Sequence, residues 1–394
     1  MVSVVACDEI GRACLRIPNY DHLVTLTGNT QTRAGSPSLG DALSGRDNAL
    51  NFVRLGLATA VILGHSWVFG AFGHSVFADF ADWSVNGFFA ISGYLIVASR
   101  LRLSFWDYMW RRALRIFPAF WVVLIATGLV VAPLAAAASG ERFELQSGLT
   151  YVFRNAALYI GQQGIEDTLM TVPFPYIWNL SLWTLVHEFS FYVVVAIALL
   201  VPWVRRNGLL FFCILVVVLV GFRIAAFTVL DLELSVFFKN TLRLGGFFAA
   251  GAVVYFLRDR IRVSWIWLGI ATAVTGVFYA AGLLHWVGQL PFAVLVLLAG
   301  AKLPIRIGAR NDISYGVYIW GAPVQQCLAL AGGATFGPWI YALLALVATT
   351  PLALASWFWI ESPALRLKSV FQGLQRPPVP TSAAANQTLQ YDGK

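Results

Sequence analysis

The chain has 394 residues, of which 59% are hydrophobic and only 12% charged, and its mean hydropathy is +0.72. A soluble globular domain is about half apolar and a quarter charged, so this composition excludes an ordinary soluble protein and indicates a polytopic membrane protein. The net charge of +8 comes from Lys and Arg residues that lie between apolar runs, which argues against nucleic-acid binding. The four cysteines have no metal-ligand spacing, so neither a metal site nor a disulfide framework is predicted.

The two ends of the chain differ from its middle. Residues 1–48 are polar and rich in Gly, Ser and Thr, without the apolar core of a signal peptide, and we expect a flexible cytoplasmic extension. The Pro- and Ala-rich residues 369–394 are expected to form a disordered cytoplasmic tail. Residues 49–368 lie between them and are predicted to form the transmembrane domain.

Apolar runs recur throughout residues 49–368. A helix of about twenty residues crosses a bilayer, and the pattern predicts an all-α transmembrane bundle of about ten spans. These spans are predicted at 50–72, 84–101, 114–138, 180–203, 208–230, 236–257, 264–284, 287–303, 313–331 and 336–361. The run at 149–160 is a weaker eleventh candidate.

Connecting segments rich in Lys and Arg alternate along the chain with segments that are acidic or uncharged. Positive segments normally face the cytoplasm. The positive connections lie at 100–115, 205–206, 258–262, 302–310 and 366–376, and the intervening ones are acidic or uncharged. This alternation places both termini in the cytoplasm. The longest outer segment, 139–179, exceeds a simple connection and is expected to fold over the outer mouth of the bundle.

The first span carries Arg54 and His65, although an ionisable group at the centre of a bilayer costs about 3 kcal/mol. Helical geometry brings the two side chains to nearly the same face, about 16 Å apart along the axis. Gly56, Ala60 and Gly64 form an adjacent strip of small residues that favours close helix packing. We therefore predict that this helix packs inside the bundle. Alternatively, both residues have only a structural role. Arg54 then extends to the membrane interface, and His65 is a buried histidine that donates a hydrogen bond to a backbone carbonyl.

Polar residues of different spans are predicted to lie at a similar depth in the membrane. The fourth span runs inward and places Glu188 about 12 Å below the outer face, where His65 lies about 10 Å below it. Arg243 in the sixth span reaches a comparable level. Such a group indicates either an acid–base site or a network that neutralises itself. His187 lies about 100° round the helix from Glu188 and is the weaker candidate.

Arginines cluster after the second span, in FWDYMWRRALRIFPAFW at 105–121. Arg112 and Arg115 share a helix face, Arg111 lies beside them, and Arg54 is at the same inner side. Guanidinium groups bind phosphate well, so the cluster suits a phosphorylated ligand from the cytoplasm, such as coenzyme A. Alternatively, these arginines only mark the inner leaflet. Nucleotide hydrolysis and dinucleotide redox chemistry have no motif to support them.

The last two spans carry further polar groups. The ninth opens with DISYGVYIWGAPV, which places Ser314, Tyr315 and Tyr318 near its cytoplasmic end, where tyrosines are usually anchors. Glu361 ends the last span at the inner boundary. A salt bridge to the basic inner surface is expected for it.

Several segments, in this order and spacing, are similar to acyltransferase family 3, the exopolysaccharide-type membrane O-acyltransferases of bacteria. They cover about residues 46–370 and are RLGLATAVILGH, SVNGFFAISGYLI, RRALRIFPAFW, LWTLVHEFSFY, ISYGVYIWGAPV and IESPALR. The resemblance implies a helix bundle in the bacterial inner membrane. It also implies transfer of an acyl group, usually acetyl from acetyl-CoA, to a hydroxyl of a carbohydrate or lipid-linked glycan of the cell envelope.

The resemblance also implies roles for individual residues. His65 matches the family's essential first-helix histidine and Arg54 its companion, while Arg112 and Arg115 fill the RxxR loop. Glu188 matches the glutamate of a WSxxxE-like segment. The remaining candidates for acceptor, oxyanion or structural contacts are Asn86, Ser92, Trp183, Arg243, Tyr315 and Tyr318.

Two departures from the family pattern leave the acceptor open. Asn86 stands where many members have an acidic residue, and Gly321 stands where many have a histidine. His187 occupies a position that the family leaves variable. A homo-oligomer is left open as well.

The mechanism that follows has His65 as general base, its neutral form suited to neutral pH, with Glu188 orienting it or binding sugar hydroxyls. The arginines receive acetyl-CoA from the cytoplasm. Alternatively, His65 is transiently acetylated and relays the group. The competing class is a proton-coupled transporter or exporter of an envelope precursor, but the sequence has neither an internal repeat nor paired broken helices.

Overall fold

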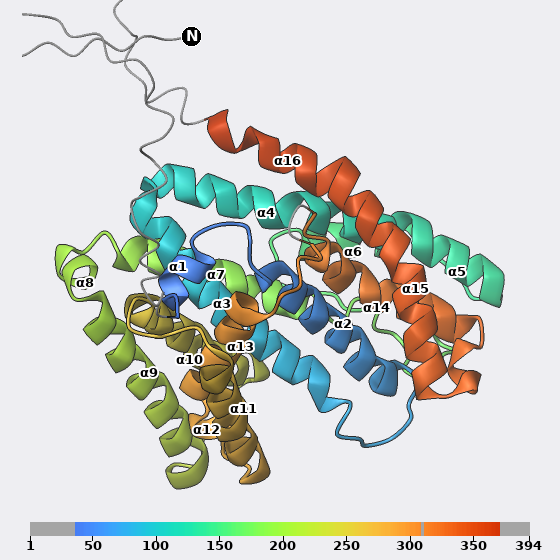
Figure 1. The fold of residues 1–394 in the computed structure, drawn as a ribbon. Helices are drawn as coiled ribbons and strands as arrows, with labels where there is room; N and C mark the ends of the chain where they lie inside the picture. Colours follow the sequence, from blue (N-terminus) through green and yellow to red (C-terminus); the bar gives the residue numbers. More distant parts are fainter. Residues whose placement is uncertain (1–35, 309–310, 371–394) are drawn as a thin grey trace, which may run out of the picture. The chain divides into compact units, whose positions relative to one another are not determined.

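The computed structural model describes residues 36–308 and 311–370. These ranges are helical and contain no β-strand, which confirms the all-α class (Figure 1). The helices are α1 (Leu39–Leu43), α2 (Leu50–Phe69), α3 (Asp79–Arg102), α4 (Phe105–Ala126), α5 (Ala132–Ser139), α6 (Leu145–Asn155), α7 (Trp183–Ala198), α8 (Pro202–Arg206), α9 (Gly208–Ile224), α10 (Val236–Leu257), α11 (Trp265–Ala280), α12 (Leu284–Val287), α13 (Gln289–Lys302), α14 (Ser314–Leu330), α15 (Pro338–Ser356) and α16 (Ser362–Arg366).

Each predicted span contains a helix of matching position. Among the described residues, six helical stretches are long and apolar enough to cross a membrane, namely Leu50–Phe69, Asp79–Arg102, Phe105–Ser139, Gly208–Val229, Val236–Leu257 and Pro338–Ser369. The helices at the other four predicted spans, α7, α11, α13 and α14, have only 14 to 17 residues. The chain is thus a multi-pass membrane protein, while the count of ten spans and the cytoplasmic termini stay predictions. The eleventh candidate corresponds only to α6, which has 11 residues.

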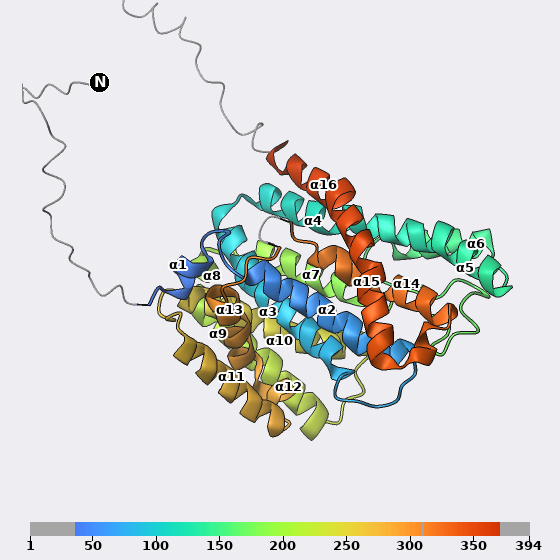
Figure 2. The same cartoon turned by 45° about the vertical axis from the view of Figure 1, so that its right-hand side comes forward.

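The helices form a bundle around α2, α3 and α14 (Figures 1 and 2). The α15–α16 run and α4 flank one side of this centre, and α9, α11 and α12 flank the other. We call the end that holds the first residues of α2 and the last of α3 and α13 the inner end. The opposite end, with Phe69 and Asp79, is the outer end. At the inner end the Ala49 N–H donates to the carbonyl of Gly300 at 2.7 Å.

Glycines bring α3 and α10 into backbone contact. A Cβ atom added at Gly93 would lie 1.9 Å from the carbonyl oxygen of Phe248, and one at Gly251 would lie 1.9 Å from that of Ala90. Any side chain at either position would therefore push the two helices apart.

The strip of small residues predicted on α2 is right at one end and wrong at the other. A Cβ atom at Gly64 would lie 2.6 Å from the backbone nitrogen of Ala81, so α3 approaches closely there. Gly56 is exposed and has nothing within 4 Å of an added Cβ atom. At this level α3 contacts the neighbouring Leu57 instead, since a Cβ atom added at Gly87 would lie 2.9 Å from the Leu57 side chain.

The first packed residues come before the boundary predicted at residue 48. Residues 1–35 of the expected extension lie outside the described residues, but the compact unit begins at Ser38. Leu39 is fully buried and its N–H donates to the carbonyl of Ile261 at 2.8 Å. The short helix α1 therefore belongs to the inner end. Residues 371–394 of the expected tail also lie outside the described residues.

The long outer segment is an ordered cap on the bundle, as its length predicts. The carboxylate of Glu141 accepts the N–H groups of Leu169, Met170 and Thr171 at 2.7 to 3.1 Å. The side-chain amide of Gln326 on α14 donates to two carbonyls of this segment, at 2.9 and 2.7 Å. The segment is thereby fixed to the outer half of α14.

Candidate active site

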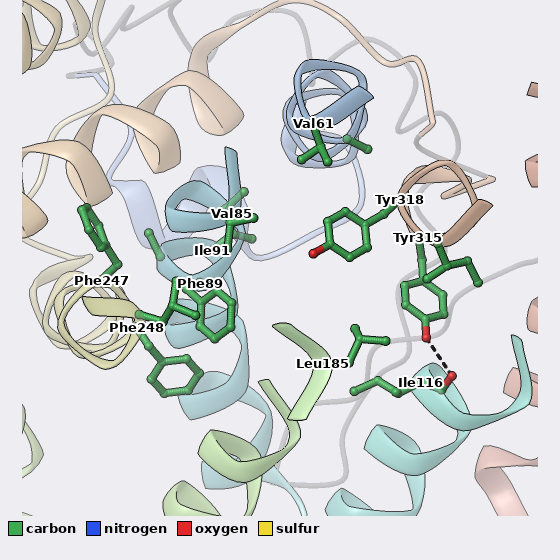
Figure 3. Packing of buried hydrophobic residues seen from close by; sticks show 14 of the residues in the cluster. Val61, Val85, Phe89, Ile91, Ile116, Leu185, Phe247, Phe248, Tyr315 and Tyr318 are labelled. Atoms are coloured by element: carbon green, nitrogen blue, oxygen red, sulfur yellow. Dashed lines mark hydrogen bonds between the residues drawn. The ribbon is translucent and has the colours of Figure 1, made fainter. Parts of the chain in front are cut away.

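A cavity of about 200 Å³ opens between α2, α3, α4, α7 and α14, and we call it the inner cavity. The predicted site residues on its wall are Arg54, Ser92, Arg111, Arg112, Arg115, Glu188, Tyr315 and Tyr318. Figure 3 shows part of the apolar wall, where Tyr318 extends from α14 toward Val85 and Ile91 of α3. The Tyr315 hydroxyl donates to the carbonyl of Ile116 at 2.8 Å and is therefore engaged with α4. Eight candidates chosen from separate sequence segments thus share one cavity.

Two of the four arginines are already paired. Asp312, just before α14, accepts from Arg54 and from Arg115 at 2.8 Å. Arg115 also pairs with Glu361 at 3.1 Å, which meets the expectation for that glutamate. Although burial favours the protonated acid, Arg54, Arg115 and Ser314 hold the pKa of Asp312 below its ordinary value. No sequence pattern predicts these contacts of Asp312, although this residue opens the DISYG motif.

The other two arginines have no carboxylate partner. Within the described ranges, neither Arg111 nor Arg112 forms an ion pair. The buried Nε of each lacks a hydrogen-bond acceptor. The Arg112 guanidinium lies 5.9 Å from the ring centres of Tyr108 and Tyr192. These two cations are therefore available to an anionic ligand in the inner cavity.

Glu188 faces the inner cavity from α7. Its carboxylate accepts a hydrogen bond from Ser92 at 3.1 Å and a short one from Tyr192. Ser92 was a candidate on the basis of its motif alone, and this contact gives it a place in the site. Tyr192 was not predicted, although it lies one helical turn after Glu188.

His65 lies farther out than Glu188. Its Nδ1 is 3.5 Å from the hydroxyl of Ser181 in the turn before α7, and its ring packs edge-on against Phe69. Ser181 precedes Glu188 by seven residues, about 10 Å along a helix. The predicted common depth of His65 and Glu188 is therefore not observed. The cause is that α2 already ends at Phe69, whereas α7 begins below the outer cap.

Hydrogen bonds connect His65 with the inner cavity. The Tyr318 hydroxyl donates to the carbonyl of Ser181 at 2.8 Å and lies 2.5 Å from the Thr184 hydroxyl. Thr184 and Tyr318 both line the inner cavity. On the other side, Gln325 donates to the carbonyl of Ile62 at 2.8 Å and holds α2 against α14. We call His65, Ser181, Thr184 and Tyr318 the central layer.

A second, larger cavity of about 700 Å³ lies toward the outer end, and we call it the outer cavity. Three residues that the sequence analysis discusses line its wall, namely Trp183, His187 and Arg243. Arg243 pairs with Asp82 at 2.9 Å. The ring nitrogens of His187 each lie 3.3 Å from a backbone carbonyl, so this buried histidine is held structurally. Asn179 and Leu180 bring the wall of this cavity next to Ser181.

A third cavity of about 480 Å³ extends from the inner cavity to the inner surface. The two share the wall residues Leu95, Leu365 and Lys368. We call this third cavity the vestibule. Arg46 and Arg366 add positive charge to its wall, and Arg366 belongs to a connection that the sequence predicts to be positive. Asn86 lines none of the three cavities. It is fully buried, and its amide has no hydrogen-bond partner among the described residues.

The site residues predicted from the sequence all lie within one protein-family match. A family model described as an acyltransferase domain matches residues 47–358. The chain belongs to acyltransferase family 3. This acyltransferase is 27% identical over 367 residues to nodulation protein 10 of Rhizobium leguminosarum bv. viciae, covering 83% of this chain and 95% of that protein.

A second relative is the O-acetyl transferase of Shigella phage Sf6. The acyltransferase is 28% identical to it over 336 residues, which are 80% of this chain and 95% of the phage protein. No solved structure matches the acyltransferase.

Proposed function

We propose that the acyltransferase moves an acetyl group from acetyl-CoA, bound from the inner end, to a hydroxyl of a carbohydrate or other cell-envelope acceptor in the outer cavity. The observation that carries this proposal is the central layer, which separates a basic inner cavity from a polar outer one. The name of the phage relative, an O-acetyl transferase, supports acetyl as the group that is moved.

The charge distribution supports coenzyme A as the donor. Arg111 and Arg112 lack carboxylate partners among the described residues, and Lys368 stands where the vestibule meets the inner cavity. Phosphate groups bind strongly to guanidinium and ammonium groups in a partly buried site. The apolar wall beyond them suits the pantetheine arm. Arg54 and Arg115, being paired, position Asp312 and the start of α14.

In the proposed reaction, the oxygen of the acceptor hydroxyl attacks the thioester carbonyl, and His65 accepts the proton of that hydroxyl. The carbon–sulfur bond then breaks, and the protonated imidazole returns the proton to the leaving thiolate. Ser181 orients the His65 ring. Tyr318 and Thr184 both donate to the carbonyl of Ser181 and thereby hold this residue beside His65.

The topology that fits this reaction has the inner end toward the cytoplasm, where acetyl-CoA is made, and the protein in the bacterial inner membrane. The basic residues of the vestibule agree with the positive-inside rule. A proton-coupled carrier remains the competing class, and it would give no acetylated product in detergent.

The test is an assay of the detergent-purified protein with radiolabelled acetyl-CoA and an extract of envelope glycans. We expect acetylated glycan from the wild type, and a loss of at least about a hundredfold for His65→Ala. His74→Ala is the matched control, because His74 is an exposed histidine outside the three cavities. A folded His65→Ala variant with the wild-type rate, or a wild type without product, would contradict the proposal.

A further inference from the structure

We infer that the acceptor held in the outer cavity carries an anionic group, a phosphate or a carboxylate, beside its hydroxyl-bearing carbohydrate. This inference rests on the proposed function, and it gives the acceptor a chemical class. It is carried by the charge, the burial and the wall composition of the outer cavity.

Positive charge exceeds negative charge on this wall. Arg223, Lys239 and Arg243 line the cavity together with one carboxylate, that of Asp82. The pair of Arg243 with Asp82 neutralises one of the three cations. In residues 36–308 and 311–370, neither Arg223 nor Lys239 forms an ion pair. Two positive charges therefore remain on the wall.

The guanidinium groups are held in place but still have donors to offer. Arg243 is nine-tenths buried, and its Nε has no acceptor among the described residues. Arg223 donates a short hydrogen bond to the carbonyl of His285 and lies 4.8 Å from the ring centre of Trp286. An unsatisfied buried donor costs about 1 to 3 kcal/mol. A bound anion would neutralise the charge of these groups and offer acceptors to the Arg243 guanidinium.

Lys239 stands at the lipid side of the same wall. Its ammonium group lies 5.5 Å from the ring centre of Phe227. The neighbouring Val236 and Phe237 line the cavity and are 73% and 40% exposed. The cavity thus has an apolar, membrane-facing border beside a cation. An acceptor with an anionic head and an apolar chain could approach there, as could an acidic sugar from the outer surface.

The remainder of the wall suits a carbohydrate. Amide groups of Gln163, Asn179 and Asn240 can donate and accept hydrogen bonds with hydroxyls. The rings of Tyr159 and Trp183 offer flat apolar surfaces. A volume of about 700 Å³ is within the range of small-molecule sites. Because this wall adjoins Ser181, a bound hydroxyl would be next to the central layer.

The test measures binding rather than turnover, by calorimetry on the full protein in detergent. The probes are farnesyl diphosphate for a lipid-linked phosphate, digalacturonate for a sugar carboxylate, and digalactose as the neutral control. We expect at least one anionic probe to bind more tightly than digalactose. Lys239→Gln should weaken that binding about tenfold, and Lys239→Arg should restore it.

Arg142→Gln is the matched control, since Arg142 is an exposed cation of the outer segment away from this wall. Tight binding of farnesyl diphosphate alone would assign the anion to a lipid carrier, and tight binding of digalacturonate alone would assign it to the sugar. If neither anion binds better than digalactose, or if Lys239→Gln binds both as the wild type does, the inference fails. The acetyl-transfer assay above is independent of this result.

Discussion

Arg115 and Asp312, which are 197 positions apart in the chain, form an ion pair of 2.8 Å at the inner end of the bundle. Asp312 also holds Arg54, so one carboxylate joins α2 and α4 to the start of α14. Three helices that bear site residues therefore depend on a single acidic side chain.

Replacing Asp312 by Asn should destabilise the protein. Two guanidinium groups would lose their shared counterion in a mostly buried position, and breaking a buried pair from one side costs about 3 kcal/mol. We expect a lower melting temperature in detergent. Asp259→Asn removes a carboxylate that is 69% exposed and pairs with Arg258, and it should change little. Equal melting temperatures for the two variants would contradict this account.

The same ion pairs predict a dependence of stability on pH. The pKa of Asp312 is lowered in the folded protein by Arg54 and Arg115 despite its burial, so folding favours the ionised form. This contribution is complete above the unfolded pKa of an aspartate, about 4, and is lost as the pH falls through the folded value. The stability difference between the wild type and Asp312→Asn should therefore shrink below about pH 4. A constant difference in thermal unfolding from pH 7 to the acid limit would refute the assignment.

Ser181→Ala should reduce the rate of acetyl transfer without weakening donor binding. Ser181 acts as a positioning residue through its contact with His65, and one hydrogen bond of about 1 kcal/mol corresponds to a rate loss of roughly three- to tenfold. We also expect a shifted pH–rate profile, which a purely structural effect would not produce. Ser190→Ala, at an exposed position of α7, is the control. An unchanged profile would show that Ser181 does not act on His65.

Substituting Ala for both Arg111 and Arg112 should raise the KM for acetyl-CoA and leave the fold intact. These arginines lack carboxylate partners in the described part of the chain, so their loss breaks no ion pair. Each charged hydrogen bond to phosphate contributes about 1.5 kcal/mol or more, and we expect an increase of at least about tenfold. Arg260→Ala, an exposed arginine at the inner end, should have the wild-type KM. The same KM in the double variant would return both arginines to the role of topology markers.

Gly93→Ala and Gly56→Ala should have opposite effects on stability. The added methyl group at Gly93 would meet the carbonyl of Phe248, and overpacking of this kind costs about 1 to 3 kcal/mol. At Gly56 the space is open, so the better helix propensity of alanine should stabilise α2 by about 0.5 to 1 kcal/mol. Melting temperatures that move in the same direction would disprove this packing.

The sequence predicted the all-α class, the positions of the helices and most of the inner cavity wall, because long apolar runs and clustered arginines are local signals. It did not predict the depth at which each helix begins along the axis of the bundle. The depth of Glu188 was counted from a helix start at residue 180, whereas α7 begins at Trp183 beneath an ordered cap. Asp312 was missed because its partners lie 258 and 197 positions away, and no local pattern reports such a pair.

The hydrogen bonds of the central layer limit what can cross the protein. Ser92 lines the inner cavity and Arg243 the outer one, while Tyr318 binds the Ser181 carbonyl and contacts Thr184 between the two walls. A carrier would have to break these contacts to let a whole sugar through. The proposed transfer passes only a two-carbon fragment, so under that proposal each substrate would stay on its own side of the membrane throughout turnover.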